Sequence, residues 1–247
     1  MNPRVNVVNV GATDPELAAK FFAGLGWEAQ PGGDGWLELP LASATVALWD
    51  WDALAAQARV SPASTGFRGW TLSAIFESAA EVDAVMAAAQ RGGATITKPA
   101  RAAMWGGYSG YFADLDGHLW KIVSDNKPPR GRRQREEAAA RVEAQGQPQP
   151  TSIAVTLGVG DVKESKAFYG DDLGCPVDKS FGGKFASFDL GEGSATLALY
   201  TREGLAKDAG VAVEGHGFTG LTLSSLVGTA GSFADPDGFL WHVATAP

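Results

Sequence analysis

The pattern of apolar and polar residues in the first fifty positions predicts a strand, a helix and further strands. Asp14 followed by Pro15 is typical of a helix N-terminus, because the carboxylate caps free backbone N–H groups and proline fits the first turn. Gly26 is expected to end this helix. The predicted elements are a strand at 5–10, a helix from about 13 to 25, and strands at 36–39 and 45–49.

The same order of elements follows a second time before residue 125. Helical periodicity begins at Ser78, with Glu81 near its start, and the Gly92-Gly93 pair is expected to end the helix. Apolar runs that favour strands lie at 70–76, 94–97, 108–112 and 119–124. The first half of the chain therefore contains two predicted units, each with one helix and several strands.

A compositional break separates this half from the rest of the chain. Residues 126–150 (NKPPRGRRQREEAAARVEAQGQPQP) carry prolines at both ends of a charged, alanine-rich middle, which is typical of a linker. A short exposed helix is expected there from Gln134 to Ala144. We therefore predict one domain at 1–125, a linker at 126–150 and a second domain at 151–247.

The second half repeats the first but is shorter. Thr222 lies 151 residues after its match Thr71, whereas Phe233 lies only 121 residues after its match Phe112, so 30 residues are missing in between. The loss covers the counterpart of the 78–91 helix and of the strand after it. The sheet face left open is expected to be covered by the linker, by the other domain or by a second chain in a homodimer.

One motif closes both halves and predicts a hairpin. FADLDGHLWKIV at 112–123 returns as FADPDGFLWHV at 233–243, with turn residues between two apolar runs. Because neighbouring side chains in a strand face opposite sides, the tryptophans at 120 and 241 are expected in the core. Lys121 and His242 are then expected to face a cavity or solvent. His118, at the hairpin tip, is expected to be an exposed turn residue, and His216 a loop residue.

Charge and cysteine content narrow the classes of partner. Lys and Arg number 20 against 28 Asp and Glu, a formal charge of −8, which disfavours nucleic acid and anionic membranes as partners. Cys175 is the only cysteine, so an intrachain disulfide framework is excluded. No apolar run approaches the ~20 residues needed to span a bilayer, and no signal peptide is recognised. We expect a cytoplasmic protein.

Repeated strand–helix–strand units, each half ending in an Asp-x-Asp-Gly hairpin, resemble the vicinal oxygen chelate superfamily of glyoxalases, bleomycin-resistance proteins and extradiol dioxygenases. WGGYSGYFADLDGHLW at 105–120 is the segment most similar to that superfamily. The resemblance implies an α+β fold of tandem βαβββ modules, whose curved mixed sheets form cups that hold the ligand. It covers two modules in 1–125, and one complete and one truncated module in 151–247.

The resemblance also implies where a divalent metal would bind in the metal-dependent members. Their ligands are a His or Glu in the first strand of a module and a Glu directly after the position of Trp120. In this chain those places fall on about Val7, on Ala154, on Lys121 and on His242. Apolar side chains and a lysine ammonium cannot ligate, so the usual site cannot form in 1–125. His242 remains as one candidate ligand in the second half, without carboxylate partners that we can place. We therefore predict no metal site and no cofactor.

Aromatic residues gather in the first half and predict a binding surface. Seven of the eight tryptophans lie before residue 125, and three of them flank strands near polar or glycine-rich segments, where the rim of a pocket is expected. Arg68 and Lys121 can supply polar contacts that orient a ligand. The candidate ligand-binding residues are Trp49, Trp51, Trp105, Tyr108, Arg68 and Tyr200.

Three functions remain open at this point. The first is a metal-independent binder that sequesters a planar or aromatic small molecule, such as an antibiotic, in the cup of residues 1–125. The alternative is a lyase, isomerase or dioxygenase of the same superfamily, either metal-free with Lys121 and His242 as catalytic acid/base groups or with metal ligands elsewhere. In the third, the shortened second half is an assembly module without a ligand of its own.

Overall fold

The computed structural model describes residues 3–33, 35–103, 107–226 and 230–243, and its first half contains the two predicted units. The first unit comprises β1 (Val7–Ala12), α1 (Pro15–Ala23), β2 (Gln30–Pro31), β3 (Trp36–Leu41) and β4 (Ala44–Asp50). The second comprises β6 (Trp70–Ile75), α3 (Ala79–Arg91), β7 (Thr95–Ala102), β8 (Tyr108–Ala113) and β9 (Leu119–Ser124). A short helix α2 (Trp51–Gln57) and strand β5 (Ser64–Gly66) join them.

The second half repeats this order and confirms the truncated last unit. The linker holds helix α4 (Arg132–Gln145). The third unit comprises β10 (Ser152–Val159), α5 (Val162–Ala167) with its π-helical extension η1 (Phe168–Asp172), β11 (Val177–Phe181), β12 (Phe185–Phe188) and β13 (Thr196–Thr201). After α6 (Arg202–Ala209) and β14 (Gly215–Gly217), the last unit has β15 (Leu221–Ser225), β16 (Gly231–Ala234) and β17 (Leu240–Val243). Its strands β15 and β16 are separated by only residues 226–230, which leaves no room for a counterpart of α3 or β7.

Capping residues explain where the two main helices of the first half begin. The Asp14 side chain accepts a hydrogen bond from the backbone N–H of Leu17, and Pro15 opens α1. Ser78 and Glu81 form a reciprocal capping box at α3, in which the Glu81 carboxylate accepts from the Ser78 backbone N–H at 2.7 Å. Both starts agree with the sequence pattern. The short helices α2 and α6 were not predicted.

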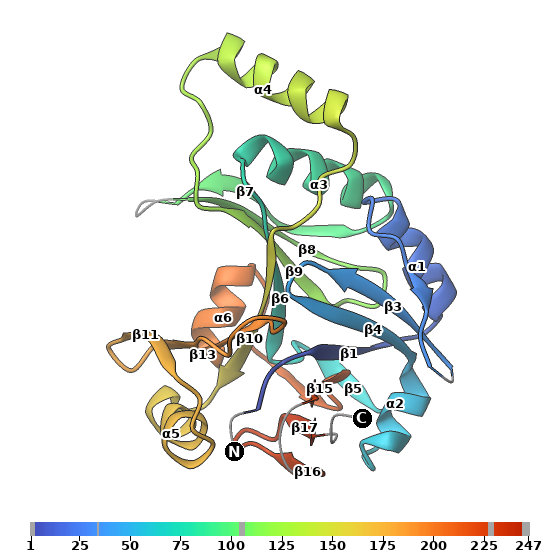
Figure 1. Ribbon diagram of the computed structural model, residues 1–247, viewed down its shortest axis with the longest axis vertical. Helices are drawn as coiled ribbons and strands as arrows, with labels where there is room; N and C mark the ends of the chain where they lie inside the picture. The colour runs from blue at the N-terminus through green and yellow to red at the C-terminus, as the bar shows by residue number, and fades with distance from the viewer. Residues whose placement is uncertain (1–2, 34, 104–106, 227–229, 244–247) are drawn as a thin grey trace.

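The strands form two large mixed sheets, and each sheet combines units from both halves of the chain (Figure 1). In the seven-stranded sheet, β1 of the first unit pairs antiparallel with β15 of the last. In the eight-stranded sheet, β6 of the second unit pairs antiparallel with β10 of the third. The curved mixed sheets confirm the predicted fold class. A cup formed by residues 1–125 alone was expected. Instead, the first and second units lie in different sheets, and strands from beyond the linker complete each sheet.

Matching contacts relate the two halves by an approximate twofold repeat. The backbone N–H of Gly11 donates to Gly220 O at 2.9 Å, and the N–H of Gly158 donates to Gly69 O at 2.6 Å. Strands β5 and β14, which occupy equivalent places in the two halves, pair with each other. Residues 64–69 and 215–220 therefore meet where the halves join.

Aromatic packing joins the tryptophan of each closing hairpin to the preceding unit. Phe22 of α1 lies against Trp120, with ring centroids 5.1 Å apart, and in the second half Tyr169 of η1 lies against Trp241 at 5.9 Å. Both tryptophans are fully buried, as the alternation predicted. The contact of Trp241 with the third unit is thus the counterpart of the one that Trp120 makes with α1. Helix α4 runs over α3 as the outermost element (Figure 1), with Val142 as its buried residue.

No helix within the described ranges is both long and apolar enough to cross a bilayer.

Candidate functional site

A buried carboxylate fixes the hairpin that closes the first half. One oxygen of Asp114 accepts hydrogen bonds from the backbone N–H groups of Asp116 and His118, and the other accepts from Trp120 Nε1 at 3.0 Å. Burial raises the pKa of Asp114 to about 7, against these hydrogen bonds, which favour the carboxylate. The hairpin is thereby held in one shape and turns the His118 side chain inward.

His118 is buried, which corrects the expectation of an exposed turn residue. Its side chain is 3% exposed, because β1 of the first unit covers it. Nε2 lies 2.7 Å from Gly11 O, which can only accept, and Nδ1 lies 2.8 Å from Arg68 Nη1, which can only donate. The ring is therefore neutral, with its proton on Nε2. Burial, and then the positive charge of Arg68, lower its pKa to about 3.

Arg68 stands at the centre of this cluster. Its guanidinium lies over the Trp51 ring, 4.5 Å from the centroid, and Trp51 also packs on Phe218. Burial lowers the pKa of Arg68, whereas the charges of Asp114 and Asp116 oppose that shift. Within the described part of the chain Arg68 forms no ion pair, and all its hydrogen bonds come from Nη1.

A cavity of about 230 Å³ opens beside Arg68 and His118. Its walls are mainly apolar, formed by Phe67, Trp70 and Leu119 together with residues that follow α6. Glu214 also borders it, but this side chain is exposed and forms no ion pair with any described residue. The cavity therefore offers an apolar space with one guanidinium and one neutral imidazole at its wall.

Lys121 lies on the same face of the eight-stranded sheet as Leu119, but it is engaged. Its Nζ is 2.9 Å from Asp208 Oδ2, and Lys98 approaches the same carboxylate at 3.1 Å. Tyr111 donates its hydroxyl to Asp208 at 2.5 Å. Burial works against ionisation of Asp208, but Lys121, Tyr111 and Lys98 together lower its pKa to about 2. The carboxylate on α6 thus occupies the space in front of Lys121.

His242 and Trp49 lie on the seven-stranded sheet, away from Arg68 and Lys121 in the strand order. Trp49 stacks on Trp36 with centroids 4.4 Å apart and donates Nε1 to Asn9. His242 Nδ1 is 2.7 Å from Ser232 Oγ, whereas its buried Nε2 has no partner among the described residues. Burial lowers the pKa of His242. It borders a separate cavity of about 390 Å³.

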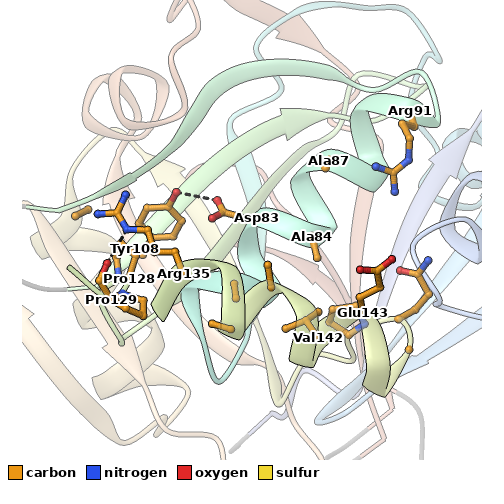
Figure 2. Close-up of a pocket in the computed structure, with 17 residues that line it drawn as sticks. Asp83, Ala84, Ala87, Arg91, Tyr108, Pro128, Pro129, Arg135, Val142 and Glu143 are labelled. Carbon is orange, nitrogen blue, oxygen red and sulfur yellow. Dashed lines mark hydrogen bonds between the residues drawn. The ribbon is translucent and has the colours of Figure 1, made fainter. Parts of the chain in front are cut away.

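The remaining candidates are dispersed. Tyr108 borders the groove between α3 and α4, where its hydroxyl donates to Asp83 at 2.8 Å, as Figure 2 shows. Burial, and then Asp83, raise the pKa of Tyr108 to about 12. Tyr200 packs on Phe185 and against the residues of α6, and Trp105 lies outside the described residues. Of the predicted ligand-binding residues, the fold brings Arg68 and Trp51 into contact.

Three important side chains were not among the predicted site residues. His118 could have been found from the repeat, because its counterpart in the second hairpin is Phe239, and an apolar counterpart indicates a buried position. Arg202 and Asp208 lie on α6, and neither position carries a local motif. Their roles depend on contacts with the other half of the chain.

The residues at the superfamily's metal positions do not fit a divalent ion. In the eight-stranded sheet, Ser73 lies between Ala154 and Lys121 on neighbouring strands, and the lysine is bound to Asp208. In the seven-stranded sheet His242 stands beside Ser224. Within the described residues no group of three or more His, Cys, Asp or Glu side chains is placed to hold a metal. A hydroxyl, an alanine and a lysine lack the charged oxygen or imidazole donors that such ions prefer.

Comparison with known proteins agrees with this architecture. The family model "Glyoxalase/Bleomycin resistance protein/Dioxygenase superfamily" matches residues 4–122. A putative dioxygenase from Bacillus subtilis subsp. subtilis str. 168 superposes with a TM-score of 0.61 at 13% identity, covering 100% of this chain and 87% of the other. The V278E mutant of glyoxalase I from Zea mays gives 0.60 at 15% identity, covering 97% and 91%. At such identities the likeness concerns the fold alone. No curated protein sequence matches the chain.

Proposed function

We propose that the protein belongs to the glyoxalase/bleomycin resistance protein/dioxygenase superfamily and is a metal-independent binder of small planar molecules. The match of that family model to residues 4–122 and the likeness of the fold over the whole chain support the membership. The proposed ligand is a single aromatic ring that carries an acidic group, held in the cavity beside Arg68. The observation that carries this proposal is the half-buried Arg68 guanidinium, stacked on Trp51 and without a carboxylate partner among the described residues.

The charge of Arg68 argues for an acidic group on the ligand. A guanidinium removed from water loses hydration that a neutral imidazole only partly replaces, so a carboxylate or phenolate oxygen would restore favourable charge interaction. His118 strengthens this preference. Its Nδ1 accepts a hydrogen bond from Arg68 Nη1, which leaves Nε and Nη2 of Arg68 for the ligand. The bidentate geometry of a guanidinium suits a planar carboxylate.

The size of the cavity argues for a single ring. An apolar cavity of about 150 Å³ holds benzene, so the volume of about 230 Å³ suits one ring with small substituents. Trp70 and Phe67 supply aromatic surface for such a ring. Larger planar molecules would need the cavity to widen.

The test is a titration of the full-length protein with benzoate and with benzyl alcohol, followed by calorimetry and tryptophan fluorescence. We expect R68Q to weaken benzoate binding by about tenfold or more, because a charge-assisted pair is lost, and to change benzyl alcohol binding little. R130Q, in the exposed start of the linker, is the matched control and should bind as the wild type does. Equal benzoate affinity in R68Q and wild type would refute the proposal.

An enzyme remains the second candidate because His242 Nε2 is free of described partners and borders a cavity. Lys121 is less suited to acid/base work, since it is bound to Asp208. The same titration therefore includes H242Q. Turnover of a bound compound by wild type, lost in H242Q while binding persists, would favour catalysis over sequestration.

A further inference from the structure

We propose a second binding site, for a small oxyanion such as a carboxylate or phosphate, between Arg68 and Arg202. A cavity of about 300 Å³ lies where the two halves of the chain meet, and both arginines border it. Arg202 does not border the aromatic cavity described above. Arg68 borders both cavities, so the two sites share that residue and Arg202 distinguishes this one from the site of the proposed function.

Arg202 is held at the junction by backbone carbonyls of both halves. Its Nη2 donates to Phe67 O at 2.5 Å and to Gly215 O at 3.1 Å, and its guanidinium lies over the Phe67 ring, 5.0 Å from the centroid. Burial lowers its pKa. Nη1 and Nε have no hydrogen-bond partner within the described ranges, and neither nitrogen contributes to an ion pair there. These donors remain for a ligand.

The other charged groups at this cavity do not neutralise the arginines. Asp237 borders it, but one carboxylate oxygen accepts from Gly160 N at 2.7 Å and the other from Ser165 Oγ at 2.7 Å. His216 is exposed and lies 3.3 Å from Thr65 Oγ1. The cavity thus has two guanidinium groups and one carboxylate, whose oxygens already accept other hydrogen bonds. This excess of positive charge favours binding of an anion.

Glycines give the oxyanion room to approach both arginines. Gly158, Gly160, Gly215 and Gly217 are among the residues that line the cavity, so part of its wall is backbone. A Cβ atom at Gly158 would lie 2.8 Å from Gly69 O and 3.2 Å from Arg202 Cα, so a side chain there would crowd the base of Arg202. The space beside Arg202 therefore depends on glycine at this position.

The arginine pair is not a product of the repeat. The counterpart of Arg68 in the second half is Thr219, and the counterpart of Arg202 in the first half is Trp51, each 151 residues away. Each half contributes one arginine from a different place in its repeat. A site of this kind therefore exists once in the chain, at one side of the approximate twofold.

The first experiment titrates the full-length protein with inorganic phosphate and, separately, with acetate at constant ionic strength, using calorimetry. We expect R202Q to weaken binding by about tenfold, R202K to lose less, and R130Q to leave it unchanged. Preference between the two probes identifies the oxyanion class. No heat with either probe at 10 mM (about 2.7 kcal/mol of binding free energy), or equal binding by R202Q, would overturn the proposal.

A second measurement on the unaltered protein keeps the test valid if R202Q does not fold. Phenylglyoxal modifies accessible guanidinium groups, and mass spectrometry reads the rate at each arginine. The preferred oxyanion should slow modification of Arg68 and Arg202 and leave Arg130 unchanged. The same rates with and without oxyanion would contradict the site. Arg68 borders both cavities, so R202Q separates the two proposals: it should weaken phosphate or acetate binding and leave benzoate binding unchanged.

Discussion

Asp114 and Asp235 hold equivalent places in the two hairpins and do the same structural work. One oxygen of Asp235 accepts from the backbone N–H groups of Asp237 and Phe239, and the other accepts the Tyr169 hydroxyl at 2.6 Å. Burial raises its pKa to about 6, as it raises that of Asp114. The hairpins differ in the side chain that this carboxylate turns inward, which is imidazole in the first and phenyl in the second. Because position 118 is histidine, Arg68 has an imidazole nitrogen to which it can donate.

The neutral state of His118 predicts a pH dependence of stability. The folded pKa of about 3 lies below the ordinary 6.5, so acid protonates the unfolded chain first and destabilises the fold as pH falls below about 6.5. Phenylalanine, present at the equivalent position 239, removes this titration. We expect the unfolding free energy of wild type minus that of H118F to rise by about 2 kcal/mol between pH 4.5 and 7.5.

Urea unfolding at the two pH values measures this difference. H216Q, at an exposed histidine, serves as the control and should show no comparable change with pH. A constant difference between wild type and H118F would mean that His118 titrates normally in the folded protein.

Among the elements, α6 decides how much of the eight-stranded sheet is open. It packs against β10 and β13 and buries Leu205, Ala206 and Ala209. Its Asp208 binds Lys98, Lys121 and Tyr111 from the second unit. A helix of eight residues has little stability by itself, so these tertiary contacts hold it in place. The cavity beside Arg68 therefore lies at the edge of α6 instead of over Lys121.

Replacing Asp208 should loosen α6. We expect D208N to lower the free energy of unfolding at pH 7 by about 1–2 kcal/mol, a modest value because the carboxylate is partly exposed. The folded pKa of about 2 lies below the ordinary 3.8, so the loss should shrink as pH falls through this window. Urea unfolding of D208N is compared with E203Q, on the exposed side of α6. Equal stability of the two variants would exclude Asp208 as the anchor.

At the scale of the whole molecule, the two halves share both sheets. The β1–β15 and β6–β10 ladders cross from one half to the other, whereas the helix–tryptophan contacts Phe22–Trp120 and Tyr169–Trp241 each lie within one half. The linker helix α4 lies outside these sheets (Figure 1). The domain boundaries at 125 and 151 stay a prediction, because continuous sheets do not say whether either half folds alone.

Cutting the linker tests how strongly the halves depend on each other. A specific protease sequence inserted after Gly131, which is exposed, allows cleavage of the folded protein. We expect the two fragments to stay together in size-exclusion chromatography and to separate only in urea, since both sheets would otherwise expose unpaired edges. Elution as two folded, separate fragments would instead establish independent domains.

The sequence by itself determined the local elements and their repetition. Periodicity, caps and turn residues are local properties, so α1, α3, the hairpins and the truncated last unit follow from residues such as Asp14, Ser78 and Asp116. Alternation along a strand likewise placed Trp120 in the core and Lys121 on the opposite face. The superfamily's metal-ligand positions could also be assigned from the sequence, because they are defined by their place in a strand or after Trp120.

Only the tertiary structure decided which units share a sheet and which side chains meet. Strand pairing across the linker depends on packing between segments about 150 residues apart, and no local pattern encodes the choice of partner. Arg68 gains His118 from a hairpin 50 residues away and Trp51 from α2, whereas Lys121 is engaged by Asp208 of the other half. Burial and charge pairing are properties of the folded neighbourhood. The sequence shows Lys121 and Arg68 only as two positive charges. The folded neighbourhood shows that Lys121 is paired with Asp208, whereas Arg68 has no carboxylate partner among the described residues.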